Sequence, residues 1–323
     1  MPFASGSQPI RPLLSLPLTI DPRDRDKFHS ALTDLREQFP ALHIGLNVRN
    51  IPDTHIVHLE GQSESQLTDL TQRLHRYNIE FNVGPLAVLC VETIGKAARA
   101  EGKYIRQTGG LGNYGHVKIR VEPNELGQGF DFINEITGGA IPERYIKPIE
   151  EGIREAAHGG ILSACEVVDF RATLWDGSYH ENDSNEMAFR IAGSLAFREA
   201  AKKANPILLE PVMAIEITVP EGHTDAILRD LNSRGGRIAE VKPLGGSRVV
   251  RAMVSLQNLL GYADELRSRF ADQVSCTMEF ARYESRPYGL FGDDGEAGFP
   301  VSRPHGPAPR TGSAAVDPSR DWT

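Results

Sequence analysis

The sequence predicts an α+β protein in which two ferredoxin-like units flank a different, elongated middle unit. Two observations support this fold class. Residues 12–83 carry alternating apolar segments and amphipathic helices in the order strand, helix, strand, strand, helix, strand, and residues 211–284 repeat that order. A βαββαβ order is typical of a ferredoxin-like fold. Residues 86–209 lack this order and carry a glycine-rich loop instead.

The first unit begins with the apolar segment Leu13–Ile20. Asp21-Pro22 then supplies a helix N-cap and a proline for the first helical position, which predicts a helix to about Phe39. In Glu64–His75 the leucines recur at helical spacing. The remaining predicted elements are strands at His43–Val48, His55–Leu59 and Ile79–Val83, with a turn at Pro52-Asp53.

The middle unit is predicted from its loops and periodic segments. We expect strands at His116–Val121 and Glu166–Leu174 and helices near Glu143–Ala157 and Ser184–Lys203. Asp183 and Glu186 are spaced as in a capping box at the start of the last helix. The middle unit is therefore a mixed α/β unit.

The last unit repeats the elements of the first. Predicted strands are Val212–Val219, Arg237–Leu244, Arg248–Leu256 and Val274–Arg282, and predicted helices are Thr224–Arg234 and Leu259–Phe270. Gly235-Gly236 stops the first helix, and Gly245-Gly246 turns the hairpin between the middle strands.

Composition limits the class of function. The chain has 35 basic and 43 acidic residues, a formal net charge of −8, so any RNA contact depends on local patches. Its three cysteines form no C-x-x-C pair, which predicts buried free thiols and neither a metal site nor a disulfide. The N-terminus does not resemble a signal peptide, and no long apolar run predicts a membrane span, so we expect a cytoplasmic protein.

The segment Gly109–Val117, GGLGNYGHV, contains the pattern G-x-G-x-x-G-x-V. A Rossmann loop needs a helix after it, but here an alternating strand follows. A kinase loop needs H-R-D and D-F-G motifs, and a phosphate loop needs G-x-x-x-x-G-K-[ST]; the sequence contains none of these. We therefore expect no nucleotide and no other cofactor at this loop.

Closely spaced glycines also allow a tight hairpin, with Asn113 and Tyr114 at its apex. Tyr114 then either stacks on a base of RNA or packs under its own hairpin, and the residues leave both open. A second polar loop, Gly177–Glu186, contains His180 but no partners with nucleophile or metal spacing, which favours an exposed polar contact over catalysis.

At these two loops the sequence resembles bacterial elongation factor G. TGGLGNYGHV is similar to the family's S-G-G-R-G-Q-Y-G-H-V, and GSYHENDSNE to its G-S-Y-H-D-V-D-S-S-E. The segment GFDFINEITGGAIPERYIKPIEEGI and the shorter LLEP, GYADELRS and TMEFARYE also match. The resemblance covers roughly residues 12–286 and implies the family's domains three, four and five in order.

The resemblance implies a leader at 1–11, a domain III-like unit at 12–85, a domain IV-like arm at 86–209 and a domain V-like unit at 210–286. Residues 287–323, rich in Gly, Pro and Ser, are predicted to be a disordered tail. In this family the arm enters the ribosomal decoding site, and His180 falls at the family's tip histidine. The implied RNA-contacting residues are Gly110, Leu111, Gly112, Asn113, Tyr114, His116, Ser178, Tyr179, His180 and Asp183.

Several positions depart from the family pattern. Leu111 stands where the family has a tip arginine, which removes a cation that could pair with phosphate. The segments Gly61–Thr68 and Asp272–Ser275 also differ from the family's G-x-G-E-L-H-L-D and G-R-A-S. No segment resembles the family's GTPase domain, so we expect a protein that is not an enzyme.

The sequence therefore predicts a non-catalytic, ribosome-binding translation factor-like protein that modulates elongation or ribosome disassembly through rRNA at the decoding site. The alternative is the C-terminal half of a split translational GTPase that needs a separate GTPase-bearing chain. Neither interpretation involves DNA, a membrane, a cofactor or a metal.

Overall fold

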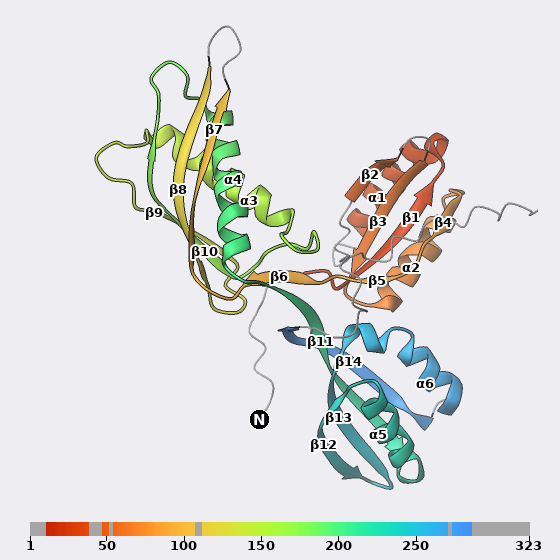
Figure 1. Ribbon diagram of the computed structural model, residues 1–323. Coiled ribbons are helices and arrows are strands. Elements are labelled where there is room, and N and C mark those ends of the chain that lie inside the picture. Colours follow the sequence, from red (N-terminus) through yellow and green to blue (C-terminus); the bar gives the residue numbers. More distant parts are fainter. Residues whose placement is uncertain (1–10, 39–46, 52–53, 107–111, 271–272, 286–323) are drawn as a thin grey trace, which may run out of the picture.

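The computed structural model describes residues 11–38, 47–51, 54–106, 112–270 and 273–285. Three units are visible in Figure 1, and the middle one extends away from the other two as an elongated lobe. The predicted tail at 287–323, nearly all of the leader, and the site residues Gly110 and Leu111 lie outside the described residues.

The first unit is an antiparallel sheet in the order β2-β3-β1-β4, with β5 also paired to β1. Its elements are β1 (Leu14–Ile20), η1 (Pro22–Asp24), α1 (Arg25–Gln38), β2 (Asn47–Ile51), β3 (Thr54–Gly61), α2 (Glu64–His75), β4 (Phe81–Val83) and β5 (Ala87–Val88). The Ser63 side chain caps α2 by accepting the Gln66 N–H. Leu67, Leu70 and Leu74 of α2 are buried, as their spacing predicts.

The last unit has the same strand arrangement, β12-β13-β11-β14. Its elements are β11 (Pro206–Pro220), η3 (Glu221–His223), α5 (Thr224–Ser233), β12 (Arg237–Leu244), β13 (Ser247–Ser255), η4 (Leu256–Leu259), α6 (Tyr262–Phe270) and β14 (Ser275–Ser285). Buried side chains of the first and last units form one contiguous cluster. Glu64 at the start of α2 accepts the Gly261 N–H at 2.9 Å across that contact.

The middle unit is a sheet in the order β7-β8-β10-β9, with β9 parallel to β10 and the other pairs antiparallel. Its elements are β6 (Val91–Ile94), β7 (Ala98–Arg106), β8 (Asn113–Pro123), β9 (Phe130–Asn134), η2 (Glu143–Tyr145), α3 (Ile146–His158), β10 (Phe170–Ser178) and α4 (Glu186–Lys203). Side chains of α3 and α4 form a second core with one face of this sheet. The α+β fold class is confirmed.

Strand β7 is not predicted by the sequence pattern. This strand alternates charged residues with Ala98, Ala100 and Gly102, which are too small to give an apolar strand pattern. Small residues fit there because α4 packs closely over that face of β7. The small residues of β7 are set by the short distance between this strand and α4, which the sequence of the strand alone does not reveal.

The middle unit joins the other two at a junction that we call the base. There β6 pairs with the beginning of β11, with Ile94 opposite Pro206. Glu92 of β6 is fully buried, and its carboxylate accepts backbone N–H groups of Ile161, Leu162, Ser163 and Cys165 at 2.7–3.3 Å. One side chain therefore holds the loop after α3 against the strand that enters the unit.

Candidate functional site

The end of the middle unit farthest from the base is built from two loops, and we call it the tip. One loop joins β7 to β8, and the other, residues 179–185, joins β10 to α4. The two meet where the Tyr114 N–H donates to the Asp183 carbonyl at 2.8 Å, and Tyr114 and Ser184 form an isolated parallel bridge. The structure therefore brings the glycine loop and the histidine loop together.

Asp183 connects the two loops through its side chain as well. Its Oδ1 accepts the Gly112 N–H at 2.9 Å, and its Oδ2 lies 3.2 Å from Nδ1 of His180. A Cβ added at Gly112 would lie 3.0 Å from the Asp183 carboxyl group, so glycine fits the close approach of the loops. Asp183 thus positions His180 and the beginning of β8 together.

The predicted capping box between Asp183 and Glu186 is wrong. Asn185 is the N-cap of α4, because its Oδ1 accepts the Ala188 N–H at 2.9 Å. Its amide also donates to Asn113 Oδ1 at 2.8 Å. The carboxylate of Asp183 is committed to the glycine loop, 71 residues away in sequence, which local spacing does not reveal.

Ser184 and Asn185 are tip residues that are absent from the set predicted from the sequence. The Ser184 hydroxyl donates to the Tyr114 carbonyl at 3.0 Å and accepts the His180 N–H at 2.9 Å. The hydroxyl of Tyr145 donates to the Ser184 carbonyl at 2.9 Å. The available signal was the Ser-Asn pair directly before a helix, which is typical of capping residues.

Tyr114, His116 and Ser178 lie in neighbouring strands on the same side of the sheet. The Ser178 hydroxyl is 2.7 Å from the Tyr114 hydroxyl and 2.9 Å from Nδ1 of His116. Tyr114 is the second residue of β8, is half-buried and lies 6.4 Å from the His180 ring between centroids. Tyr114 and His116 thus both bond to Ser178, and their position fits a supporting role beneath the tip.

Of the predicted site residues that the structure describes, Tyr179 and His180 are the exposed ones. Tyr179 is 40% exposed, and the His180 side chain is 55% exposed. An exposed aromatic ring next to an imidazole held by a carboxylate can stack on a base and donate to RNA. Among the described residues there is no group of three or more potential metal ligands.

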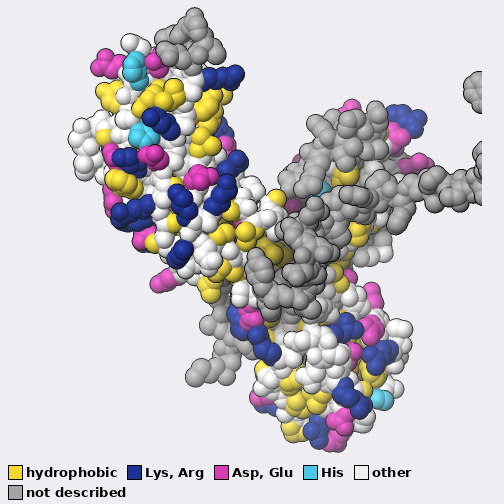
Figure 2. Space-filling view, in the orientation of Figure 1, with side chains coloured by type: hydrophobic (Ala, Val, Ile, Leu, Met, Phe, Trp, Pro, Cys, Tyr) yellow, Lys and Arg dark blue, Asp and Glu magenta, His cyan; other side chains and the backbone are white. Residues whose placement is uncertain are grey.

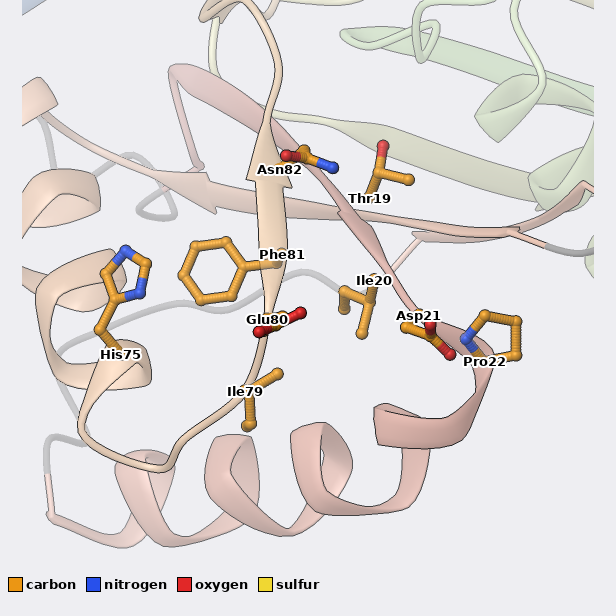
Figure 3. Close-up of a pocket in the computed structure, with 9 residues that line it drawn as sticks. All are labelled: Thr19, Ile20, Asp21, Pro22, His75, Ile79, Glu80, Phe81 and Asn82. Carbon is orange, nitrogen blue, oxygen red and sulfur yellow. The ribbon is translucent and has the colours of Figure 1, made fainter.

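The first unit contains a hollow of about 540 Å³ (Figure 3). It lies between the end of β1, the end of α2 and β4, and Figure 3 shows His75 beside Phe81, whose rings stack at 4.5 Å. Hydrogen bonds from the Arg23 side chain and backbone lower the pKa of Asp21 at its rim to about 2. Because that carboxylate is already paired with its neighbour, the hollow offers no strong ligand-binding group there.

Comparisons with known proteins give the family. The model of elongation factor G, domain IV, matches residues 87–205, and that of the elongation factor G C-terminus matches residues 207–289. The two matches together cover more than half of the sequence. The chain belongs to the elongation factor G family.

A solved structure is also similar to this chain. A crystal structure of a protein from Thermus thermophilus shares 36% sequence identity, with a TM-score of 0.67 over 88% of this chain. The chain spans 42% of the length of that protein. Among the described residues, no helix is long and apolar enough to cross a membrane.

Proposed function

We propose that this chain is a non-catalytic ribosome-binding factor whose tip contacts rRNA at the decoding site. The observation that carries the proposal is the tip itself, where Asp183 joins the two loops and leaves Tyr179 and His180 exposed at the end of a domain IV-like unit. Membership of a translation factor family supports the ribosome as the partner. Such a factor would act in the cytoplasm, where it modulates elongation or ribosome disassembly.

The role of the tip residues divides in two in this proposal. Tyr179 and His180 contact RNA directly, while Gly112, Asn113, Asp183 and the hydroxyls of Tyr114 and Ser178 keep the two loops in register. His116 also helps to hold the tip in place, because its Nε2 lies 3.4 Å from Oε2 of Glu101 on the neighbouring strand β7. Gly110 and Leu111, outside the described residues, belong to the same proposed contact surface.

The test is co-sedimentation of the purified chain with vacant ribosomes across a salt series. The variant Tyr179→Ala/His180→Ala is expected to weaken binding about tenfold or more, because stacking of one base contributes roughly 1–3 kcal/mol. Leu162→Ala/His158→Ala is a matched control at the base, where Leu162 is 39% exposed and the His158 side chain 60% exposed. The control should bind as the wild type does.

Two results would contradict the proposal. Equal weakening by the tip variant and the control would show that the tip is not the contact. No binding even at low salt would overturn a stand-alone role and favour the alternative, in which a separate GTPase-bearing chain is needed. Addition of that second chain would then restore binding to ribosomes.

A further inference from the structure

The sheet of the middle unit has one face packed on helices and one face without them. In β8 the alternate residues Val117, Ile119 and Val121 are fully buried in the core with α3 and α4. The residues between them therefore point to the other side of the sheet. We call this other side the open face; Figure 2 shows Lys and Arg side chains on the middle unit, interspersed with Asp and Glu.

Trp175 lies on the open face at an irregularity in β10. The pairing of β10 with β8 shifts register between Leu174 and Asp176, so Trp175 is the extra residue of a β-bulge. Trp175 is 40% exposed, with Lys118 Nζ 5.3 Å and Arg99 Cζ 6.0 Å from the centroid of its ring. A bulge changes the direction of a side chain, and here it sets a large aromatic ring among cations.

The cations around Trp175 fall into two groups. Lys118, Arg120 and Arg171 are each paired with a carboxylate, from Asp176, Glu122 and Asp131 respectively. Arg99 and Lys103 of β7 take part in no ion pair among the described residues. Both are exposed, so Arg99 beside the ring and Lys103 farther along β7, opposite His116, remain available for an anionic ligand.

We propose that the open face binds single-stranded RNA, with Trp175 stacked on an unpaired base and Arg99 and Lys103 on phosphates. Aromatic side chains on a sheet combined with a cationic surface are the means by which proteins bind unpaired RNA. An acidic protein would use the cations but has no need of the ring. The combination therefore favours a ligand that carries both negative charge and flat aromatic groups.

The open face continues into the tip. In the register of β7 and β8, Lys103 lies opposite His116 and Ile105 lies opposite Tyr114. Lys118 and Arg120 are on the same side of β8 as these two residues, so the open face runs along β8 to the tip. An RNA strand that meets Tyr179 and His180 can follow β8 to Trp175. The inference extends the proposed function, but it is tested separately because RNA binding to the isolated chain is measured directly.

Intrinsic fluorescence gives a direct test. Trp175 and Trp322 are the two tryptophans of the chain, so Trp322→Phe leaves Trp175 as the single indole. Titration of this variant with decauridylate at about 50 mM salt is expected to quench the fluorescence in a saturable way. Polyglutamate, which is anionic but cannot stack, should not reproduce the quenching.

Binding of labelled decauridylate, followed by anisotropy, separates the two groups of residues. Trp175→Ala should weaken binding about tenfold, and Trp175→Phe should keep most of it because phenylalanine also stacks. Arg99→Ala/Lys103→Ala should reduce the slope of log Kd against log salt by about 1.4, as expected for two phosphate contacts on a single strand. Arg198→Ala/Lys203→Ala, exposed on α4, removes the same charge on the opposite side and should change neither value.

Three results would overturn the inference. They are no binding of decauridylate at about 50 mM salt, unchanged binding by Trp175→Ala, and equal quenching by polyglutamate, which would indicate a general polyanion surface. If decauridylate fails while ribosomes still bind through Tyr179 and His180, the open face is excluded and the proposed function stands. Quenching of Trp175 fluorescence by RNA without ribosome binding would support RNA binding by the open face and overturn the proposed function.

Discussion

The tip and the base of the middle unit are each held together by one carboxylate, but in different ways. At the base, Glu92 is fully buried and accepts four backbone N–H groups. At the tip, the Asp183 side chain is 27% exposed, accepts one N–H from Gly112 and lies beside His180. The base carboxylate is saturated by the fold, whereas the tip carboxylate keeps part of its surface in solvent.

The difference shows how a structural carboxylate differs from one in a contact site. A buried carboxylate is costly unless several donors replace its water, and the donors are left without partners when it is removed. When an exposed carboxylate is removed, water takes its place beside the donors. We therefore expect the base to determine the stability of the unit and the tip to determine what it binds.

The largest effect is expected for Glu92→Ala. The substitution leaves four backbone N–H groups without their acceptor, and we expect the free energy of unfolding to fall by about 4 kcal/mol. Urea unfolding followed by circular dichroism measures it. The nearby Glu166→Ala, which removes partly exposed ion pairs with Arg11 and His158, should cost less than about 1 kcal/mol. Equal losses of unfolding free energy for the two variants would show that the buried carboxylate of Glu92 stabilises the base no more than the partly exposed one of Glu166.

The second effect concerns the strand beneath the tip. A Cβ at Gly115 would lie 2.5 Å from the Ala188 carbonyl oxygen of α4, so Gly115→Ala must push β8 away from the helix. We expect a loss of about 2 kcal/mol in the free energy of unfolding. Gly112→Ala is the control, since the three atoms nearest to its Cβ all belong to the end of the Asp183 side chain, at 3.0–3.3 Å, and none to backbone. A larger loss for Gly112→Ala would mean that the tip loops are as rigid as the core.

A smaller effect is expected for Asp183→Ala. Only one N–H, that of Gly112, loses its acceptor, together with the contact to the exposed His180, so we expect about 1 kcal/mol. The same unfolding experiment measures this loss. Ribosome co-sedimentation is measured in parallel, and the loss of binding free energy should exceed the loss of unfolding free energy. A loss near that of Glu92→Ala would show that the two carboxylates act alike.

The last test leaves the fold unchanged and reports on the base through Cys165. Burial raises the pKa of the Cys165 thiol to about 12. A raised thiol pKa favours the neutral, unreactive form, so alkylation at pH 8 should be at least a hundredfold slower than for an exposed thiol of pKa about 8.5. Above pH 8 the alkylation rate of Cys165 should rise about tenfold per pH unit. Peptide mass spectrometry identifies the modified cysteine.

Glu92→Ala provides the comparison for that experiment. The Cys165 N–H donates to Glu92, so release of the loop should expose the thiol and speed its alkylation. Burial also raises the pKa of Cys276 in the last unit, to about 11, and its rate should stay unchanged as an internal control. Equal rates for Cys165 in both proteins would mean that Glu92 does not hold this loop.

The sequence allowed most of the regular elements to be predicted and only part of the tip. Alternation and helical spacing predicted α2 and the strands of the last unit, because burial on one face leaves a periodic pattern. Tyr114 was left open between stacking on RNA and packing in its own hairpin, and the structure places its hydroxyl against Ser178. The roles of Ser184 and Asn185 were missed because their partners lie in another loop.

The sequence alone determined the α+β class and the repeat of one βαββαβ order, and it predicts that the glycine loop is not a dinucleotide loop, since a strand follows Gly115. These properties depend on local order and period. Only the tertiary structure decided that Asp183 binds the glycine loop, that Glu92 holds residues 161–165, and that Trp175 turns outward at a bulge. Each depends on contacts between distant segments, and periodicity shows which face is buried but not which residue lies opposite.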